Sequence, residues 1–353
     1  MPAFARYIGV DYSGAQTPTA SLRGLRVYLA EGDALPVEVS PPPSSRKYWT
    51  RCGLAEWLVE RITKDPPTLV GIDHAFSFPR RYFEAYGLAP DWPTFLDDFQ
   101  RHWPTDEDIY VDFVRDGSRG SGAARMGNAR WRRLTEERAG GAKSVFHFDV
   151  QGSVAKSSHA GIPWLRFIRQ QVRPHVHFWP FDGWDIPARR SAVAEVYPAL
   201  WSRGFAREDR TSDQHDAYSI AAWLSQVDRE ESLAAFLRPN LSQSERRQAQ
   251  VEGWILGVSG TSRGVGRHNP TEAMLPSSSR AQGRAVKRTT DPGYTNKNDQ
   301  VVLSQTNKRG NDHNQLVYAM RCLKCGHQYG ANGSDIWQRL CPSCGGGAPG
   351  LSY

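Results

Sequence analysis

Short apolar runs that end near acidic residues alternate with helix-like segments over most of this chain. The runs YIGVD at 7–11 and TLVGID at 68–73 each end at an aspartate, and SAVAEVYPALW at 191–201 carries a glutamate. Between them, GLAEWLVERI at 53–62 and IPWLRFIRQQV at 162–172 place apolar residues three and four apart, which is typical of amphipathic helices. This alternation predicts an α/β domain with a mixed sheet flanked by helices.

Further strands and helices complete that domain. LRGLRVYLAEG at 22–32 alternates as a paired strand would, and VEVSPPP at 37–43 predicts a third strand that the prolines stop. VHFWPFDGW at 176–184 predicts a strand and a turn. Helical spacing returns from Ser212 to about Val227 and again over 245–258.

The composition changes after residue 260. Residues 261–310 are rich in Ser, Arg, Gly, Asn and Thr and show little periodicity, so we expect a flexible, basic linker that could contain a small hairpin near 293–306. Three parts are therefore predicted: an α/β domain over 1–260, the linker over 261–310, and a small C-terminal domain over 311–353.

The C-terminal part carries the strongest motif. Its four cysteines form two C-x2-C pairs with fifteen residues between them, at Cys322, Cys325, Cys341 and Cys344. This spacing predicts a zinc ribbon, in which four thiolates hold one structural Zn²⁺ ion. About forty residues bury too little surface to fold alone, so a metal is physically expected. Because four sulfurs close the coordination shell, we predict no catalysis there; His327 is then expected at the surface and Cys52 in the core.

Composition narrows the class of protein. The 353 residues include 39% hydrophobic residues and twelve tryptophans, enough for a packed core. No run approaches the roughly twenty apolar residues that span a bilayer, and the N-terminus has no charged-then-apolar leader. Five cysteines, four of them clustered, do not make a disulfide framework, so we expect a cytoplasmic protein with no membrane partner.

The net charge of +7 is concentrated in two stretches, 115–143 and 263–309, which more than account for it. Such blocks suit a polyanionic partner, because each phosphate contact releases counterions. The alternative is a solvated surface and a disordered linker. If nucleic acid is the partner, the candidate contacts are Arg125, Arg130, Trp131, Arg132, Arg133 and Lys156, with Trp131 able to stack on a base. His159 is a further candidate, although exposed loop polar residues are the commoner case.

Acidic residues form the second candidate site. Asp11, Asp73 and Glu195 lie at or near strand ends, and Asp213 and Asp216 share one face at the start of a helix. A single buried carboxylate can be a cap or an ion pair. Five together would repel one another unless divalent cations neutralised them, and Mg²⁺ or Mn²⁺ prefers such oxygen ligands. Two such ions can stabilise the attacking and leaving oxygens of a phosphodiester.

The start of the acidic helix also has a local explanation. Thr211 or Ser212 can cap a helix N-terminus, and carboxylates in the first turn suit the positive end of the helix dipole. That explanation accounts for one acid or two but not for a pair on one face. His215 lies between the two aspartates and is expected to belong to the cap or the surface, with water activation as its alternative role.

GVDYSG, GIDHAFSFP, AEVYPALW and SDQHDAYSIAAW, in this order, resemble domain of unknown function family 429, the predicted RNase H-like nucleases. The resemblance covers about residues 5–258, and the Holliday-junction-resolvase branch of the RNase H-like fold shares its acidic pattern. It implies that Asp11 is the central ligand of two metal ions and that Asp73, Glu195, Asp213 and Asp216 complete the site. The sequence departs from the family at His74, where a small or apolar residue is more frequent.

These observations favour a metal-dependent nuclease that acts on DNA or RNA, with the zinc ribbon helping to grip the nucleic acid. The first alternative is an ATP-dependent phosphotransferase of the actin and sugar-kinase superfamily, because GVDYSG resembles its first phosphate loop. Against it, Asp73 is followed by His74 and Ala75 rather than by a second D-x-G loop, and no G-x4-G-K-[ST] run exists. The second alternative is an inactive nucleic-acid-binding protein, which would gain nothing from buried acids.

Overall fold

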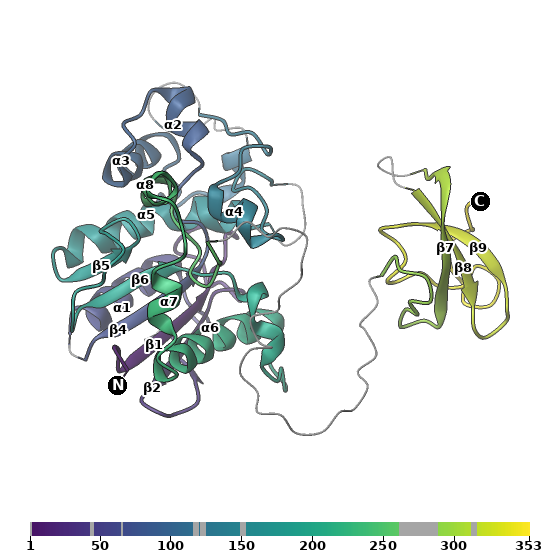
Figure 1. Cartoon of the computed structure of the whole chain (residues 1–353), viewed down its shortest axis with the longest axis horizontal. Helices are drawn as coiled ribbons and strands as arrows, with labels where there is room; N and C mark the ends of the chain where they lie inside the picture. The colour runs from purple at the N-terminus through teal and green to yellow at the C-terminus, as the bar shows by residue number, and fades with distance from the viewer. Residues whose placement is uncertain are drawn as a thin grey trace. The chain divides into compact units, whose positions relative to one another are not determined.

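A computed structural model describes residues 2–42, 46–64, 66–115, 120, 125–148, 153–260, 289–311 and 316–353. It divides into two compact units, Met1–Arg267 and His268–Tyr353 (Figure 1). The linker predicted over 261–310 falls largely outside the described residues. Its last part, from residue 289, belongs to the second unit instead, because a strand there pairs with the cysteine-bearing segment.

The first unit is built on a six-stranded mixed sheet, as predicted for an α/β domain. Its strands, in the order β3-β2-β1-β4-β6-β5 across the sheet, are Val37–Glu38, Arg26–Glu31, Arg6–Asp11, Thr68–Asp73, Ser191–Glu195 and Val176–Trp179. The first three pair antiparallel, whereas β1, β4, β6 and β5 run parallel. The parallel strands therefore end at one edge of the sheet, where their last side chains are neighbours.

Helices cover both faces of this sheet (Figure 1). The longer ones are α1 at Arg51–Ile62, α3 at Trp92–His102, α5 at Ala155–Val172, α6 at Ser212–Arg229 and α8 at Gln243–Glu252. Shorter ones are α2 at Arg80–Tyr86, α4 at Leu134–Ala139, α7 at Leu233–Leu237, and the 3-10 turns Val111–Arg115, Pro198–Leu200 and Ser202–Gly204. Among the helices in the described ranges, none combines the length and the apolar character needed to cross a membrane.

Alternation along the strands divides the core into two layers. Ile8 and Val10 of β1 pack with the residues of α1 and α5, whereas Tyr7 lies in the other layer with Ile220 and Leu224 of α6. Because successive strand side chains point to opposite faces, β1 and β4 each present one face to α5 and the other to α6. Acids from neighbouring strands can therefore lie together only when their side chains leave the same face of the sheet.

The second unit is a three-stranded antiparallel sheet with a small core. Its strands are β7 at Gln300–Arg309, β8 at Leu316–Cys322 and β9 at Gln328–Asn332. Five buried residues form its apolar cluster: Val302, Met320, Tyr329, Ala331 and Ile336. The side-chain amide of Asn296 is buried beside them and donates to the carbonyls of Ile336 and Arg339, at 2.7 and 2.9 Å. So small a core places much of the stability elsewhere.

Candidate functional site

Two of the predicted acids lie side by side at the end of the central strands. Asp11 of β1 and Asp73 of β4 are direct partners in the parallel register. Each follows a glycine by two residues, and a Cβ at Gly9 or Gly71 would meet atoms of α6. Because side chains two apart in a strand share a face, both carboxylates lie on the α6 side of the sheet.

Helix α6 comes unusually close to the sheet at these glycines. A Cβ on Gly9 would lie 2.2 Å from the carbonyl oxygen of Ala217, and one on Gly71 would lie 2.7 Å from Ile220 Cγ2. Neither distance is sterically possible, so only glycine permits this approach. The two glycines therefore hold the start of α6 against the strand ends that carry Asp11 and Asp73.

The acids of α6 lie one turn before those contact points. Asp213 precedes Ala217 by four residues and Asp216 precedes Ile220 by four, so each lies over the sheet edge. The helix begins with a capping box between Thr211 and Gln214, as the cap prediction required. Its start is thus fixed by local hydrogen bonds, while its two aspartates point toward the strand-end acids.

The charges of these four aspartates interact. Burial, followed by the negative charges of Asp73, Asp213 and Asp216, raises the pKa of Asp11 well above its usual value. Burial and then Asp216 and Glu195 do the same to the pKa of Asp73. The pKa of Asp216 is also raised, mainly by burial. Four carboxylates from three separate segments, between residues 11 and 216 of the sequence, therefore form one electrostatic cluster, here called the aspartate cluster.

One carboxylate oxygen of Asp73 also lacks a hydrogen bond within the described residues. This atom, Oδ1, is buried. A buried carboxylate oxygen without a partner is costly, and a bound cation is one way to remove that cost. The oxygens of the aspartate cluster are hard ligands of the kind that Mg²⁺, Mn²⁺ or Ca²⁺ accepts. Within the described residues, however, only the cysteines bring three or more ligand atoms within 4.8 Å of one another.

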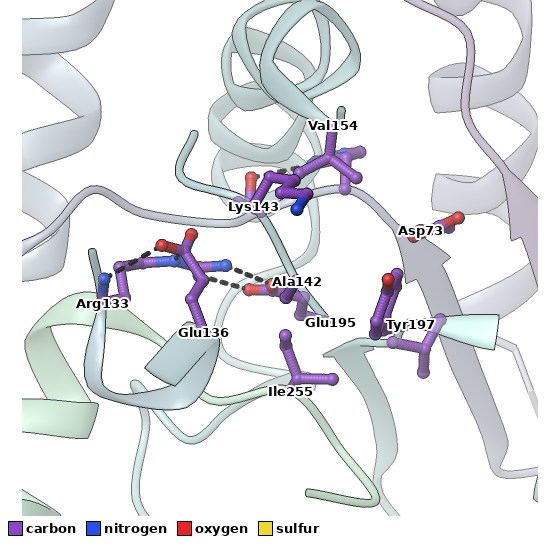
Figure 2. Close-up of a pocket in the computed structure, with 12 residues that line it drawn as sticks. Asp73, Arg133, Glu136, Ala142, Lys143, Val154, Glu195, Tyr197 and Ile255 are labelled. Carbon is purple, nitrogen blue, oxygen red and sulfur yellow. Dashed lines mark hydrogen bonds and ion pairs between the residues drawn. The ribbon is translucent and has the colours of Figure 1, made fainter. Parts of the chain in front are cut away.

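Glu195 lies on the other face of the sheet from the four aspartates, although its charge still raises the pKa of Asp73. It pairs with Ile72 in the register, one position away from Asp73, and its neighbours Ala194 and Val196 lie in the α6 layer. Its side chain therefore leaves the opposite face of the sheet. Figure 2 shows its carboxylate held by Arg133, apart from that of Asp73. The prediction that Glu195 completes the acidic site fails by one residue of strand register.

Arg133 is likewise not a surface cation. Its side chain is 1% exposed and donates to both oxygens of Glu195, at 2.6 and 2.7 Å, and to Glu136 at 2.8 Å. Glu195 also accepts from the backbone amide of Phe76. The prediction that Arg133 contacts nucleic acid is wrong, because its guanidinium is buried and is paired with the carboxylates of Glu195 and Glu136.

We expect Arg133→Met to lower the free energy of unfolding of the first unit by about 3–5 kcal/mol, because it leaves the charges of Glu195 and Glu136 buried and unpaired. Arg130→Met is the matched control: Arg130 is exposed, so its loss should cost less than about 0.5 kcal/mol. Urea denaturation followed by tryptophan fluorescence measures both. Equal midpoints for the two variants would contradict the structural role of Arg133.

A small cavity lies between Asp73 of the aspartate cluster and Glu195 of the Arg133 ion pair. It has a volume of about 20 Å³ and is lined by residues that include Asp73, His74, Lys143, Glu195 and Tyr197 (Figure 2). This is room for about one water molecule with polar partners on its wall. Burial and then Asp73 raise the pKa of Tyr197, so its hydroxyl stays protonated and able to donate at neutral pH.

His74 and the other predicted histidines are structural. His74 is buried against Tyr12 and against Gly161 of α5, and burial lowers its pKa to about 4. His159 is buried among aromatic rings, and burial likewise lowers its pKa to about 4. His215 has its Nε2 atom 3.0 Å from the carbonyl oxygen of Ser202. This contact directs His215 to the segment before α6, which agrees with the cap-region interpretation.

The remaining basic candidates are scattered. Arg125 is bound to Asp98 at 2.7 Å and lies over the ring of Tyr86, so its charge is already balanced by the Asp98 carboxylate. Arg130 and Arg132 are exposed, and Trp131 is half-buried against Phe146. These positions leave Arg130 and Arg132 as surface cations. Lys156 is the second residue of α5 and pairs with Asp112, which is itself exposed.

The cysteines meet at one point of the second unit. All four sulfurs lie within 4.8 Å of one another, with Cys322 and Cys344 at 3.7 Å and Cys325 and Cys341 at 3.6 Å. The backbone amide of Cys325 lowers the pKa of Cys322 to about 6, so this thiolate is available at neutral pH. The cluster could hold a metal ion such as Zn²⁺. Cys52 and His327 take no part in it.

The raised pKa values of the aspartates predict how stability changes with pH. A carboxyl whose pKa is higher in the folded than in the unfolded state destabilises the fold once it ionises, so this contribution worsens as pH rises above about 4 toward the raised values. We expect the parent to lose more stability over this window than Asp73→Asn, and Mg²⁺ to restore it. Thermal unfolding against pH, with and without Mg²⁺, measures the difference. Parallel curves for parent and variant would rule out the electrostatic strain.

No protein-family model, no curated protein and no solved structure matches this chain. Function therefore has to be inferred from the residues and their arrangement.

Proposed function

We propose that this protein is a metal-dependent nuclease that hydrolyses phosphodiester bonds of DNA or RNA at the aspartate cluster. The observation that carries the proposal is the placement of Asp11, Asp73, Asp213 and Asp216 on one face of the sheet, with a buried oxygen of Asp73 left without a partner among the described residues. Arg26, the register partner of Asp11 in β2, is paired with Glu38 at 2.9 Å, whereas a structural ion pair supplies its cation directly, as Arg133 does for Glu195.

The strand order supports an RNase H-like fold for the first unit. Three antiparallel strands, β1 to β3, lie beside the parallel strands β4 and β6. Asp11 and Asp73 are the last residues of the two central strands, β1 and β4. The family 429 resemblance implies the same fold and the same central role for Asp11. With Glu195 paired elsewhere, the proposed ligands reduce to the four aspartates.

The aspartates would hold Mg²⁺ or Mn²⁺ through Asp11 and Asp73 from the sheet and Asp213 and Asp216 from α6. When bound there, divalent cations supply charge that stabilises the attacking and leaving oxygens of the phosphodiester. The chain's own contribution is rigid placement, because Gly9 and Gly71 fix the distance between the two pairs of acids.

The second unit has a separate proposed role. We infer that its four cysteines bind one structural Zn²⁺, which closes the coordination shell and leaves no open position for substrate. The exposed lysine and arginine side chains of this unit then give nucleic acid a second contact surface.

A cleavage assay tests the proposal. The protein is incubated with single-stranded, duplex and branched DNA and RNA in Mg²⁺, in Mn²⁺ and without divalent cations. Cleavage that requires the cation supports a nuclease. ATP hydrolysis or phosphoryl transfer with no cleavage of any substrate would overturn it in favour of a phosphotransferase, and nucleic-acid binding without either reaction would favour an inactive binding protein.

A further inference from the structure

The segment that leads into α6 is built onto that helix at three places. We call residues 201–211 the pre-helix arm. Trp201 stacks on Trp223, with ring centroids 3.9 Å apart, and the carbonyl of Ser202 lies 3.0 Å from His215 Nε2. At its far end, the guanidinium of Arg210 lies 3.8 Å from the ring centre of Tyr218. An arm held at three points keeps its place relative to the aspartates of α6.

Two of the three arginines of this arm, Arg207 and Arg210, differ in how their guanidinium groups are bonded. Both terminal nitrogens of Arg210 have partners within the chain: it pairs with Glu208 at 2.9 Å and donates to the carbonyl of Ala206. Arg207 is exposed and donates only through Nε, to the carbonyl of Arg210 at 3.0 Å. Within the described part of the chain, its two terminal nitrogens have no partner. Arg207 therefore presents a guanidinium whose plane is fixed on one side and whose fork is free.

The position of this free fork is informative. The backbone amide of Arg210 bonds to the carbonyl of Arg207, so a tight turn places Arg207 just before the N-cap Thr211. Thr211 opens α6, whose first turns carry Asp213 and Asp216, so Arg207 lies close along the chain to the helix acids of the aspartate cluster. A cation beside an acidic cluster usually pairs with an acid, but here the terminal nitrogens are left for another anion.

We propose that Arg207 binds a backbone phosphate of the nucleic-acid substrate next to the scissile one. The planar fork of an arginine matches two oxygens of a phosphate, and the Nε bond to Arg210 reduces the entropy that binding would otherwise cost. This inference rests on the proposed nuclease function, because the phosphate is that of its substrate.

Equilibrium binding tests the proposal without relying on cleavage. Fluorescence anisotropy of labelled single-stranded and duplex 20-mers is measured in Ca²⁺ at several salt concentrations. For Arg207→Ala we expect a Kd about tenfold higher and a salt slope smaller by about 0.7–0.9, as one lost phosphate contact predicts. Arg207→Lys should keep the salt slope while recovering only part of the affinity, since it keeps the charge and loses the fork.

Arg81→Ala is the matched control. Arg81 is an exposed arginine on α2, far from α6 in Figure 1, so its removal changes the net charge equally and should leave Kd and slope within error. If Arg207→Ala binds like Arg81→Ala, or if the parent binds no oligonucleotide, the inference is overturned. If binding depends on Arg207 but the parent cleaves nothing in Mg²⁺ or Mn²⁺, the phosphate contact of Arg207 holds and the nuclease proposal fails.

Discussion

Removal of the metal from the cysteine cluster should unfold the second unit and leave the first unit folded. The apolar cluster of the second unit contains five buried residues, too few to offset the entropy of ordering its chain. Without a cation the four sulfurs cannot all ionise, because hydrogen bonding to Cys325 and then Cys322 raises the pKa of Cys344 to about 12. Because a metal that binds only the folded state adds its binding free energy to folding, its loss removes the main stabilising contribution.

Hydrogen exchange measures this directly. After treatment with a chelator, peptides from β8 and β9 should lose protection, while peptides from β1 and β4 keep it. Cys344→Ser should give the same pattern without a chelator, and Cys52→Ser should not, because Cys52 lies outside the cluster. The purified protein should contain one zinc per chain. Full protection of β8 in protein shown by elemental analysis to be metal-free would refute the structural role.

Asp11→Asn should abolish cleavage while nucleic-acid binding survives. Asp11 interacts with all three other aspartates, so its loss removes the charge that joins the sheet pair to the helix pair. The loss should exceed the roughly 10²–10³-fold that removal of one electrostatic stabiliser costs. Binding should be equal or tighter, because one negative charge near the phosphate backbone has been removed.

The control for this variant keeps the same change of charge. Asp33→Asn also removes one carboxylate, but the Asp33 side chain is 94% exposed in the turn after β2, and cleavage should be unchanged. Cleavage rates and anisotropy are compared for parent and both variants in Mg²⁺. Asp11→Asn also relieves like-charge repulsion, so its unfolding temperature without divalent cations should not fall below that of the parent. Retained cleavage in a variant that folds normally would place catalysis elsewhere.

The fold and the sites were predictable to different depths. The cysteine cluster could be predicted because its ligands lie within 23 residues and their spacing reports directly on geometry. The mixed sheet could be predicted because β1 and β4 are apolar runs with clear ends. Asp11 and Asp73 could be placed in one site because each closes an apolar run, but their direct pairing could not be predicted, since nothing in either run states its register.

Glu195 marks where sequence reasoning stops. Every residue of β6 is buried, so the run has no polar alternation from which to tell which face its last residue takes. Arg133 was missed for a related reason: a basic block predicts an exposed surface, and only tertiary packing brings Glu195 to it. The i and i+3 spacing of Arg133 and Glu136 was the one local signal of that ion pair.

The two glycines beneath α6 have a consequence for how this chain can vary. A methyl group at position 9 or 71 would force the helix away from the strands and widen the gap between the two pairs of aspartates, although no ligand had been replaced. A tolerated change at position 9 would need a shifted backbone at 217 and 221, and one at position 71 would need a shorter side chain at 220. The separation between the sheet aspartates and the helix aspartates is thus set by two glycines that have no functional group of their own.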